Sequence, residues 1–191
     1  KKALDAAVLA ISKNPGIAAA NLSTSRMIDD IAEEYGCEVI RTAVGEANVA
    51  KAMIENKCVI GGEGNGGVID LRVGPIRDSL AAMALVLQLY VESDKKISEL
   101  AKEIGGYCII KDKIGADKDQ AAKIIELAKE KFAGAKINTI DGCRFDFDDA
   151  WVHLRTSNTE PVMRIIVEAE NKNTADKYMK SVYEIKKAVL N

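Results

Sequence analysis

The chain has 191 residues, of which 48% are apolar and 29% charged, and its formal net charge is −2. This composition is typical of a folded globular protein with one large domain or two small ones, each with its own core. A charge this close to zero, without a basic run, argues against nucleic acid as a partner, and no apolar stretch approaches the ~20 residues of a membrane span.

The first region alternates helical and strand patterns. It is predicted to contain helices at residues 4–11, 27–36, 45–56, 80–92 and 97–104, and strands at residues 16–22, 37–42 and 57–60. Ser23, Thr24 and Ser25 are candidate caps for the second helix, and Arg77-Asp78-Ser79 begins the fourth. This alternation predicts a three-layer α/β domain with a mainly parallel sheet.

The pattern changes near residue 110. A strand-like connector at residues 107–111 and a break at Gly115 precede a predicted helix at 119–132, four short strands at 137–140, 143–147, 150–154 and 163–168, and a closing helix at 174–190. Strands grouped between two helices predict a smaller α+β domain with an antiparallel sheet. We therefore expect two domains, at residues 1–110 and 111–191, with a hinge at residues 107–115.

A glycine-rich loop follows the strand predicted at residues 57–60, with glycines at positions 61, 62, 64, 66 and 67. Such a loop can cradle a phosphate, so a dinucleotide site is one interpretation. The spacing is not Gly-x-Gly-x-x-Gly, and residues 68–71 continue as an extended segment rather than a helix. The loop instead offers the carboxylate of Glu63 and the amide of Asn65, which suit sugar hydroxyls. A solvated loop acid is the alternative for Glu63.

A second polar motif, Arg155-Thr156-Ser157-Asn158-Thr159-Glu160-Pro161, is followed by Arg164. No aliphatic side chain falls within it, which predicts a loop, and the apolar residues 165–167 predict a buried strand after it. Arginine meets two phosphate oxygens with one planar fork, and the hydroxyl and amide groups add short donors. The segment is either an oxyanion-binding loop or a polar turn with surface arginines.

The two motifs resemble those of the α-D-phosphohexomutases, the superfamily of phosphoglucomutase, phosphomannomutase and phosphoglucosamine mutase. Residues 155–161 and Arg164 match the family's phosphate-binding pattern, Arg-x-Ser-(Gly or Asn)-Thr-(Glu or other)-Pro with an Arg shortly after. Residues 61–69 resemble the family's sugar-binding loop, in the family's order and at about its spacing. The resemblance covers nearly the whole chain and corresponds to the third and fourth of the family's four domains.

The resemblance implies a role for each motif. The residues implied to bind the substrate phosphate are Arg155, Ser157, Asn158, Thr159 and Arg164, and those implied to bind the sugar are Glu63, Asn65, Gly62 and Gly64. Asn65 and Gly67 stand where many members have Ser and His, a departure shared by subfamilies with a Gly-Glu-Gly-Asn-Gly-Gly loop. Gly45-Glu46 resembles a further segment near the substrate and is a weaker candidate.

The family's catalytic serine loop and its Asp-rich magnesium loop match nothing in this chain, so we expect no catalytic residue and no metal ligand here. The chain begins Lys-Lys-Ala-Leu without Met, and we expect it to be the C-terminal part of a longer protein and inactive alone. The resemblance implies that the full-length protein, with Mg²⁺, interconverts hexose 1-phosphate and hexose 6-phosphate. The reaction would pass through a phosphoserine enzyme and a bisphosphorylated sugar.

The implied substrate is a phosphate of glucosamine, mannose or glucose, and the missing N-terminal domains are implied partners. Two alternatives stay open: a phosphosugar-binding module without catalysis, and a nucleotide-binding α/β protein, which the glycine spacing disfavours.

The remaining polar candidates have structural interpretations. Four widely spaced cysteines predict reduced thiols in a cytoplasmic protein. His153 is the single histidine and alternates with Trp151 and Arg155 along a predicted strand, so we expect it to face the loop side or solvent in a packing role. We expect Trp151 to belong to the core rather than to stack on a sugar.

Overall fold

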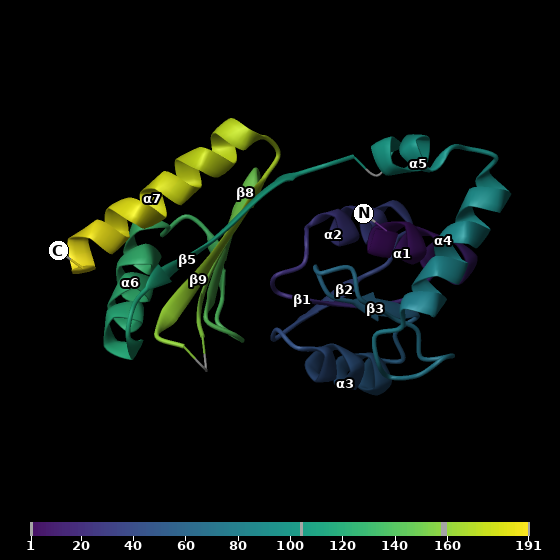
Figure 1. Cartoon of the computed structure of the whole chain (residues 1–191), viewed down its shortest axis with the longest axis horizontal. Helices are drawn as coiled ribbons and strands as arrows, with labels where there is room; N and C mark the ends of the chain where they lie inside the picture. Colours follow the sequence, from purple (N-terminus) through teal and green to yellow (C-terminus); the bar gives the residue numbers. More distant parts are fainter. Residues whose placement is uncertain (1, 104, 158–159, 191) are drawn as a thin grey trace. The chain divides into compact units, whose positions relative to one another are not determined.

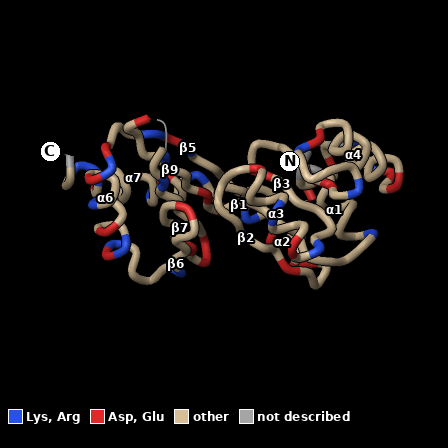
Figure 2. The backbone as a smooth tube through the Cα atoms, turned by 90° about the horizontal axis from the view of Figure 1, so that it is seen from below, with Lys and Arg blue, Asp and Glu red and all other residues tan. Residues whose placement is uncertain are grey.

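The computed structural model describes residues 2–103, 105–157 and 160–190, and the chain divides into two compact units, Lys1–Gly106 and Tyr107–Asn191 (Figure 1). Acidic and basic residues are interspersed along both units (Figure 2). In the part of the chain that is described, no helix is both long and apolar enough to cross a membrane.

The first unit is a three-layer α/β domain. Its elements are α1 (Lys2–Lys13), β1 (Ala18–Asn21), α2 (Met27–Glu34), β2 (Val39–Thr42), α3 (Glu46–Asn56), β3 (Ile60–Gly62), β4 (Val68–Ile69), α4 (Ser79–Ser93) and α5 (Ile97–Glu103). The strand order is β2-β1-β3-β4, with β1 parallel to β2 and β3, and β4 antiparallel to β3. Helix α3 covers one face of the sheet, and α1 and α2 cover the other (Figure 1). The predicted fold class is confirmed for this half.

Small residues let the helices approach the sheet closely. The central strand β1 reads Ala-Ala-Ala-Asn and is buried along its whole length, as expected for a parallel strand covered on both faces. A Cβ on Gly61 would collide with the Sδ atom of Met53, which α3 packs against the sheet. Any larger residue at position 61 would therefore have to displace the buried Met53 side chain from the space between α3 and β3.

The predicted start of α2 at Met27 is confirmed, although the residue at the N-cap position is Arg26 and its side chain makes no capping hydrogen bond. Of the three candidate caps, Ser25 accepts a hydrogen bond from the Met27 N–H at 3.2 Å through its hydroxyl oxygen. One predicted boundary in this unit is wrong. The strand predicted at 57–60 begins only at Ile60, because α3 ends in a left-handed residue, Lys57 (φ 52°), and the chain must still turn back. The start of α4 is confirmed, since the Asp78 carboxylate accepts a hydrogen bond from the Ala81 N–H at 2.7 Å.

The second unit is an α+β domain. It contains β5 (Cys108–Gly115), α6 (Lys118–Lys131), β6 (Lys136–Asn138), β7 (Cys143–Asp146), β8 (Ala150–Thr156), β9 (Val162–Ala169) and α7 (Lys172–Leu190). The sheet is antiparallel throughout, in the order β5-β9-β8-β7-β6, and both helices cover the same face (Figure 1). Alternate strand residues such as Phe145, Val152 and Ile165 form the core with them. The predicted antiparallel class is confirmed.

The segment predicted as a connector and hinge is an eight-residue strand. All of β5 pairs with β9, from Cys108 opposite Ala169 to Gly115 opposite Val162. Its backbone is therefore held in the ladder of the second unit, and residues 108–115 are not a hinge. The sequence obscured the strand because its middle, Lys111-Asp112-Lys113, is charged, which an edge strand tolerates.

Candidate functional site

Three loops leave the carboxyl ends of the parallel strands in the first unit. They follow β1 (residues 22–26), β2 (residues 43–45) and β3 (residues 63–67). In open α/β sheets this edge is where ligands bind, because the loops there converge around the strand ends. Glu63, the first residue after β3, lies among these loops and its exposed fraction is only 8%.

The Glu63 carboxylate is held by groups from three other segments. Its Oε1 accepts hydrogen bonds from the Asn21 side-chain amide at 2.8 Å and from the Gly45 N–H at 3.2 Å. Its Oε2 lies 3.1 Å from the guanidinium of Arg77. A buried carboxylate needs such partners to stay charged. Glu63 is therefore not a solvated loop acid, and its orientation is set by the loops after β1 and β2 and by the segment before α4.

Arg77 joins two acidic residues. Its Nε donates to Oε2 of Glu46 at 2.6 Å and its backbone N–H to Oε1 at 2.8 Å, while a second guanidinium nitrogen contacts Glu63. The backbone N–H and then the side chain of Arg77 hold the pKa of the Glu46 carboxyl below its ordinary value. A Cβ on Gly67 would collide with the Cδ of Arg77. Arg77 thus fills the space that a side chain at position 67 would need.

The glycine loop is the turn of a β-hairpin. The Glu63 N–H donates to the Gly67 carbonyl at 2.9 Å, and Gly66 adopts φ +94°, which favours glycine. The Asn65 side-chain oxygen accepts from the Gly67 N–H at 3.1 Å, so Asn65 braces the turn while remaining exposed. The loop is thereby shaped before any ligand arrives.

Gly62 and Gly64 let the hairpin pack closely on itself and on the loop after β1. A Cβ on Gly62 would lie 2.5 Å from the Gly67 carbonyl, and one on Gly64 would lie 2.9 Å from the Ser23 carbonyl. Both distances are shorter than any real Cβ contact, so only glycine lets the hairpin close and touch the loop after β1.

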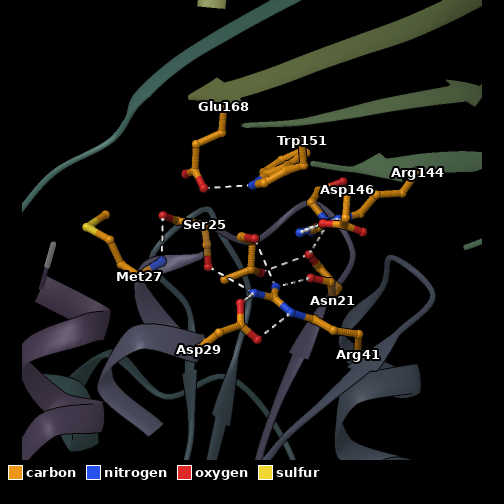
Figure 3. Close-up of polar contacts among 11 residues, drawn as sticks. Asn21, Ser25, Met27, Asp29, Arg41, Arg144, Asp146, Trp151 and Glu168 are labelled. Atoms are coloured by element: carbon orange, nitrogen blue, oxygen red, sulfur yellow. Dashed lines mark hydrogen bonds and ion pairs between the residues drawn. The ribbon is translucent and has the colours of Figure 1, made fainter. Parts of the chain in front are cut away.

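Arg41 organises the loop after β1. Its guanidinium donates to the carbonyls of Asn21 at 3.0 Å, Thr24 at 2.9 Å and Ser25 at 3.1 Å, and it forms an ion pair with Asp29 (Figure 3). These contacts fix the loop so that Asn21 reaches Glu63. Asn21, Arg41 and Arg77 were not among the predicted site residues. The one available signal was a polar residue at the end of an otherwise apolar strand, which Asn21 shows after three alanines.

The second motif is only partly a loop. Arg155 and Thr156 are the last residues of β8, since they pair with Arg164 and Met163 of β9, so the loop proper is shorter than predicted. The Ser157 N–H donates to the Val162 carbonyl at 2.9 Å, which closes the turn. Of the predicted phosphate-binding residues, Asn158 and Thr159 lie outside the described residues.

A pocket of about 280 Å³ adjoins this turn. The lining residues come from the motif and from the start of α6, and they are Thr156, Ser157, Glu160, Pro161, Val162, Ala116, Asp117 and Lys118. The Ala116 N–H donates to the Pro161 carbonyl at 3.1 Å and ties the two segments together.

The two arginines of the motif lie side by side on one face of the sheet. Arg155 and Arg164 are directly opposite each other on β8 and β9, so their side chains share the face away from α6 and α7. Arg164 is exposed, whereas Arg155 is half-buried and its Nε donates to the Asp141 carboxylate at 3.0 Å. Asp141, which was not among the predicted site residues, therefore orients Arg155.

His153 contacts the backbone of Asp141, the residue that orients Arg155. Its Nε2 lies 2.7 Å from the Asp141 carbonyl oxygen, and only 1% of the residue is exposed. Burial lowers the pKa of the His153 imidazole, which favours the neutral ring. The expected packing role agrees with this burial, but the expectation that His153 could face solvent is wrong. Gly142 follows Asp141 with φ +69°, and a Cβ there would collide with the Leu154 carbonyl.

Trp151 is fully buried. Its indole Nε1 donates to the Glu168 carboxylate at 2.7 Å, and the Arg144 guanidinium lies 4.2 Å above its ring while binding Asp146 (Figure 3). These contacts satisfy the polar edge of the indole and cover one ring face. Trp151 is a buried anchor of the sheet rather than a free stacking platform.

The described residues contain no group of three or more His, Cys, Asp or Glu side chains that could hold a metal ion. The four cysteines are free thiols. At the edge of the first unit's sheet, the structure places the Glu63 carboxylate, fixed by its partners, and the exposed Asn65 amide. In the second unit it places the guanidinium groups of Arg155 and Arg164 on adjacent strands, close in sequence to the Ser157 hydroxyl.

Both units of the chain match sequence models of one known protein family. Residues 3–107 match the sequence model of the phosphoglucomutase/phosphomannomutase alpha/beta/alpha domain III, and residues 108–185 match that of the phosphoglucomutase/phosphomannomutase C-terminal domain. A phosphoglucomutase/phosphomannomutase of Thermococcus kodakarensis is 42% identical over 169 residues, which are 86% of this chain and 36% of that protein. The phosphoglucosamine mutase of Methanocaldococcus jannaschii is 32% identical over 88% of this chain and 38% of that protein. The chain thus spans little more than a third of these relatives.

Solved structures show the same fold. A phosphoglucomutase/phosphomannomutase family protein from Burkholderia thailandensis superposes with a TM-score of 0.82 at 22% identity, over 98% of this chain and 41% of that one. An Aspergillus fumigatus N-acetylphosphoglucosamine mutase, solved in complex with GlcNAc-6P and magnesium, gives a TM-score of 0.71 at 12% identity, over 96% and 42%. At these identities the likeness concerns the fold alone.

Proposed function

Because the chain belongs to the phosphoglucomutase/phosphomannomutase family, we propose that it supplies the sugar-binding and phosphate-binding parts of a phosphohexomutase. Such an enzyme is an isomerase that interconverts hexose 1-phosphate and hexose 6-phosphate. The observation that carries the proposal is the held Glu63 carboxylate at the ligand-binding edge of a parallel sheet, in a chain whose other unit pairs Arg155 with Arg164.

The first unit binds the sugar in this proposal. Glu63 accepts hydrogen bonds from sugar hydroxyls, and its place is held by Asn21, Gly45 and Arg77 so that little ordering is needed on binding. Asn65 is exposed on the hairpin turn, where its side-chain nitrogen can donate to a further hydroxyl. Gly62 and Gly64 contribute by letting the hairpin and the neighbouring loop pack without side chains between them.

The second unit binds the phosphate that does not react. Arg155 and Arg164 supply two guanidinium groups from adjacent strands. Ser157 adds a hydroxyl, and Asn158 and Thr159, which follow it in the sequence, would add further short donors. Charge-assisted hydrogen bonds of this kind are about twice as strong as neutral ones. A phosphate held this firmly positions the distant reacting group, and positioning can contribute ~7–11 kcal/mol to such reactions.

The chemistry itself belongs to other parts of the full-length protein. A phosphoserine gives its phosphoryl group to the hexose phosphate, and the resulting bisphosphorylated sugar reorients within the site. The sugar's other phosphoryl group is then transferred to the serine. The non-reacting phosphate must therefore bind in two orientations of the sugar, which a dedicated oxyanion loop on a separate unit allows.

The proposal assigns the magnesium ligands to the remaining two thirds of the protein; among the described residues, no group of three or more His, Cys, Asp or Glu side chains could hold a metal ion. A related structure was solved with magnesium, and another with glucose 1,6-bisphosphate, which this proposal takes as the activating intermediate. A cytoplasmic location is part of the proposal, since four free thiols last in a reducing compartment.

The experiment is turnover by the full-length parent protein, with magnesium and a trace of hexose bisphosphate, on the 6-phosphates of glucosamine, mannose and glucose side by side. Turnover of any of them upholds the proposal, and the ratio of kcat/KM values identifies the substrate. Binding of the sugars without turnover would instead support a non-catalytic phosphosugar-binding module. The 191-residue chain alone is the matched control and should bind without turnover.

A further inference from the structure

We propose that Lys113 is an additional phosphate-binding residue, the outer member of a row of three cations that crosses the sheet of the second unit. The proposal rests on the proposed function and extends its phosphate site to β5, a strand that neither sequence motif includes. No pattern in the sequence connects Lys113 to the arginines, which follow it by more than forty residues.

The strand register places the three cations together. Lys113 on β5 is directly opposite Arg164 on β9, and Arg164 is directly opposite Arg155 on β8. Directly opposite residues have Cβ atoms about 4.5–5.5 Å apart and share one face of the sheet. Their neighbours Ile114, Met163 and Leu154 are in the core, so the row lies on the face away from α6 and α7.

The row lacks enough negative charge of its own. Arg155 pairs with Asp141, but among the described residues no carboxylate forms an ion pair or hydrogen bond with the side chain of Lys113 or Arg164. Both of these side chains belong to exposed residues. Like charges directly opposite each other on adjacent strands destabilise a sheet. An anion bound from outside would remove that repulsion.

The acidic neighbour of Lys113 in the sequence does not neutralise it. Asp112 is opposite Ile165, a core residue, so it lies on the other face of the sheet and accepts a hydrogen bond from the Tyr183 hydroxyl of α7. That bond, first among several causes, holds the pKa of the Asp112 carboxyl below its ordinary value. Asp112 is therefore already committed to a partner on the helical face.

The end of β5 is also tied to the phosphate turn. Gly115, two residues after Lys113, is opposite Val162, and the next residue, Ala116, donates to the Pro161 carbonyl at 3.1 Å. Lys113 is thus on the same end of the sheet as Ser157 and the two arginines. A lysine ammonium is a compact charge on a flexible stem, suited to a phosphate whose position shifts slightly between two orientations of the sugar.

Lys113→Met in the full-length parent protein tests this inference, with Lys111→Met as the matched control. Lys111 is exposed on the same strand and the same face, one pair further from the turn, opposite Ile166. We expect Lys113→Met to raise KM for the hexose phosphate by about 5- to 20-fold, less than a buried charged hydrogen bond would, with kcat within about twofold. Lys111→Met should leave both within about twofold. Equal KM values for the two variants, or a loss confined to kcat, would overturn the inference.

A second measurement separates this inference from the proposed function. If the wild-type parent turns over no hexose phosphate, the proposed function fails, and the row is then tested by titrating the 191-residue chain with inorganic phosphate. A dissociation constant for phosphate that is about 5- to 20-fold larger in Lys113→Met than in Lys111→Met would uphold the anion site. Equal constants, in variants with unchanged circular dichroism and Tm, would overturn it.

Discussion

Replacing Arg155 with Met removes a cation at the end of β8 that binds Asp141, a residue between β6 and β7. Methionine keeps most of the length and packing of the side chain but loses the fork that donates to Asp141 at 3.0 Å. The proposed function assigns the same fork to the substrate phosphate. Hydrogen bonds to charged groups contribute about 1.5–3 kcal/mol, so kcat/KM of the full-length enzyme should fall by roughly 10- to 150-fold.

The structure adds a second effect to this loss. The side chains of Arg155 and Asp141 are 20% and 21% exposed, so the pair is neither a surface pair nor a fully buried one. Without Arg155, the Asp141 carboxylate loses this ion-pair partner, and its negative charge then acts more strongly against a phosphate bound nearby. The double variant Arg155→Met/Asp141→Asn should therefore recover part of the lost affinity, and the coupling between the two positions measures the repulsion.

The assay is steady-state turnover of the full-length parent with its preferred hexose phosphate, for the wild type, the two single variants and the double variant. Asp141→Asn alone should raise KM less than Arg155→Met does, because Arg155 loses its orientation but keeps its charge. Thermal unfolding of each variant checks the fold. An Arg155→Met enzyme with wild-type kcat and KM would refute this reasoning, and strict additivity in the double variant would refute the part played by Asp141.

Three further changes test other parts of the structure. Glu63→Gln should lower kcat/KM by about tenfold or more, because an amide nitrogen would face the Arg77 guanidinium where the carboxylate now lies 3.1 Å away; kinetics within twofold of the wild type would contradict it. Gly67→Ala should force Arg77 from its place, lowering kcat/KM and destabilising the fold by about 1–2 kcal/mol, as seen by kinetics and denaturant unfolding. Burial, and then Asp149, raises the pKa of Tyr178 to about 12. The raised pKa of Tyr178 therefore contributes stability that is fully present below the unfolded pKa of about 10 and is lost as pH rises towards 12. Tyr178→Phe should make the free energy of unfolding fall less steeply over this pH range. An equal fall in the wild type and the variant would contradict the raised pKa.

Much of the fold was predictable because its signals are local. Helical periodicity, the Asp78 cap and the change from alternating elements to grouped strands are each written in a short window of sequence. The two motifs were also recognisable as such, and Glu63 does lie at the carboxyl end of a parallel strand. The roles of the individual residues in binding stay predictions.

What the sequence could not determine depends on contacts between distant segments. β5 is a strand because its backbone pairs with β9, some fifty residues later, while its charged middle conceals the pattern. The partners of Glu63 come from residues 21, 45 and 77, and their meeting depends on how three loops converge at one sheet edge. The cation row likewise exists only through strand register.

By itself, then, the sequence determined the family, the two fold classes and the two motifs, because local periodicity and short polar patterns carry that information. Only the tertiary structure decided which side chains hold Glu63, which acid orients Arg155 and which lysine joins the arginines. Those pairings follow from register and loop convergence, and a shift of one residue in a strand would turn each of these side chains to the opposite face.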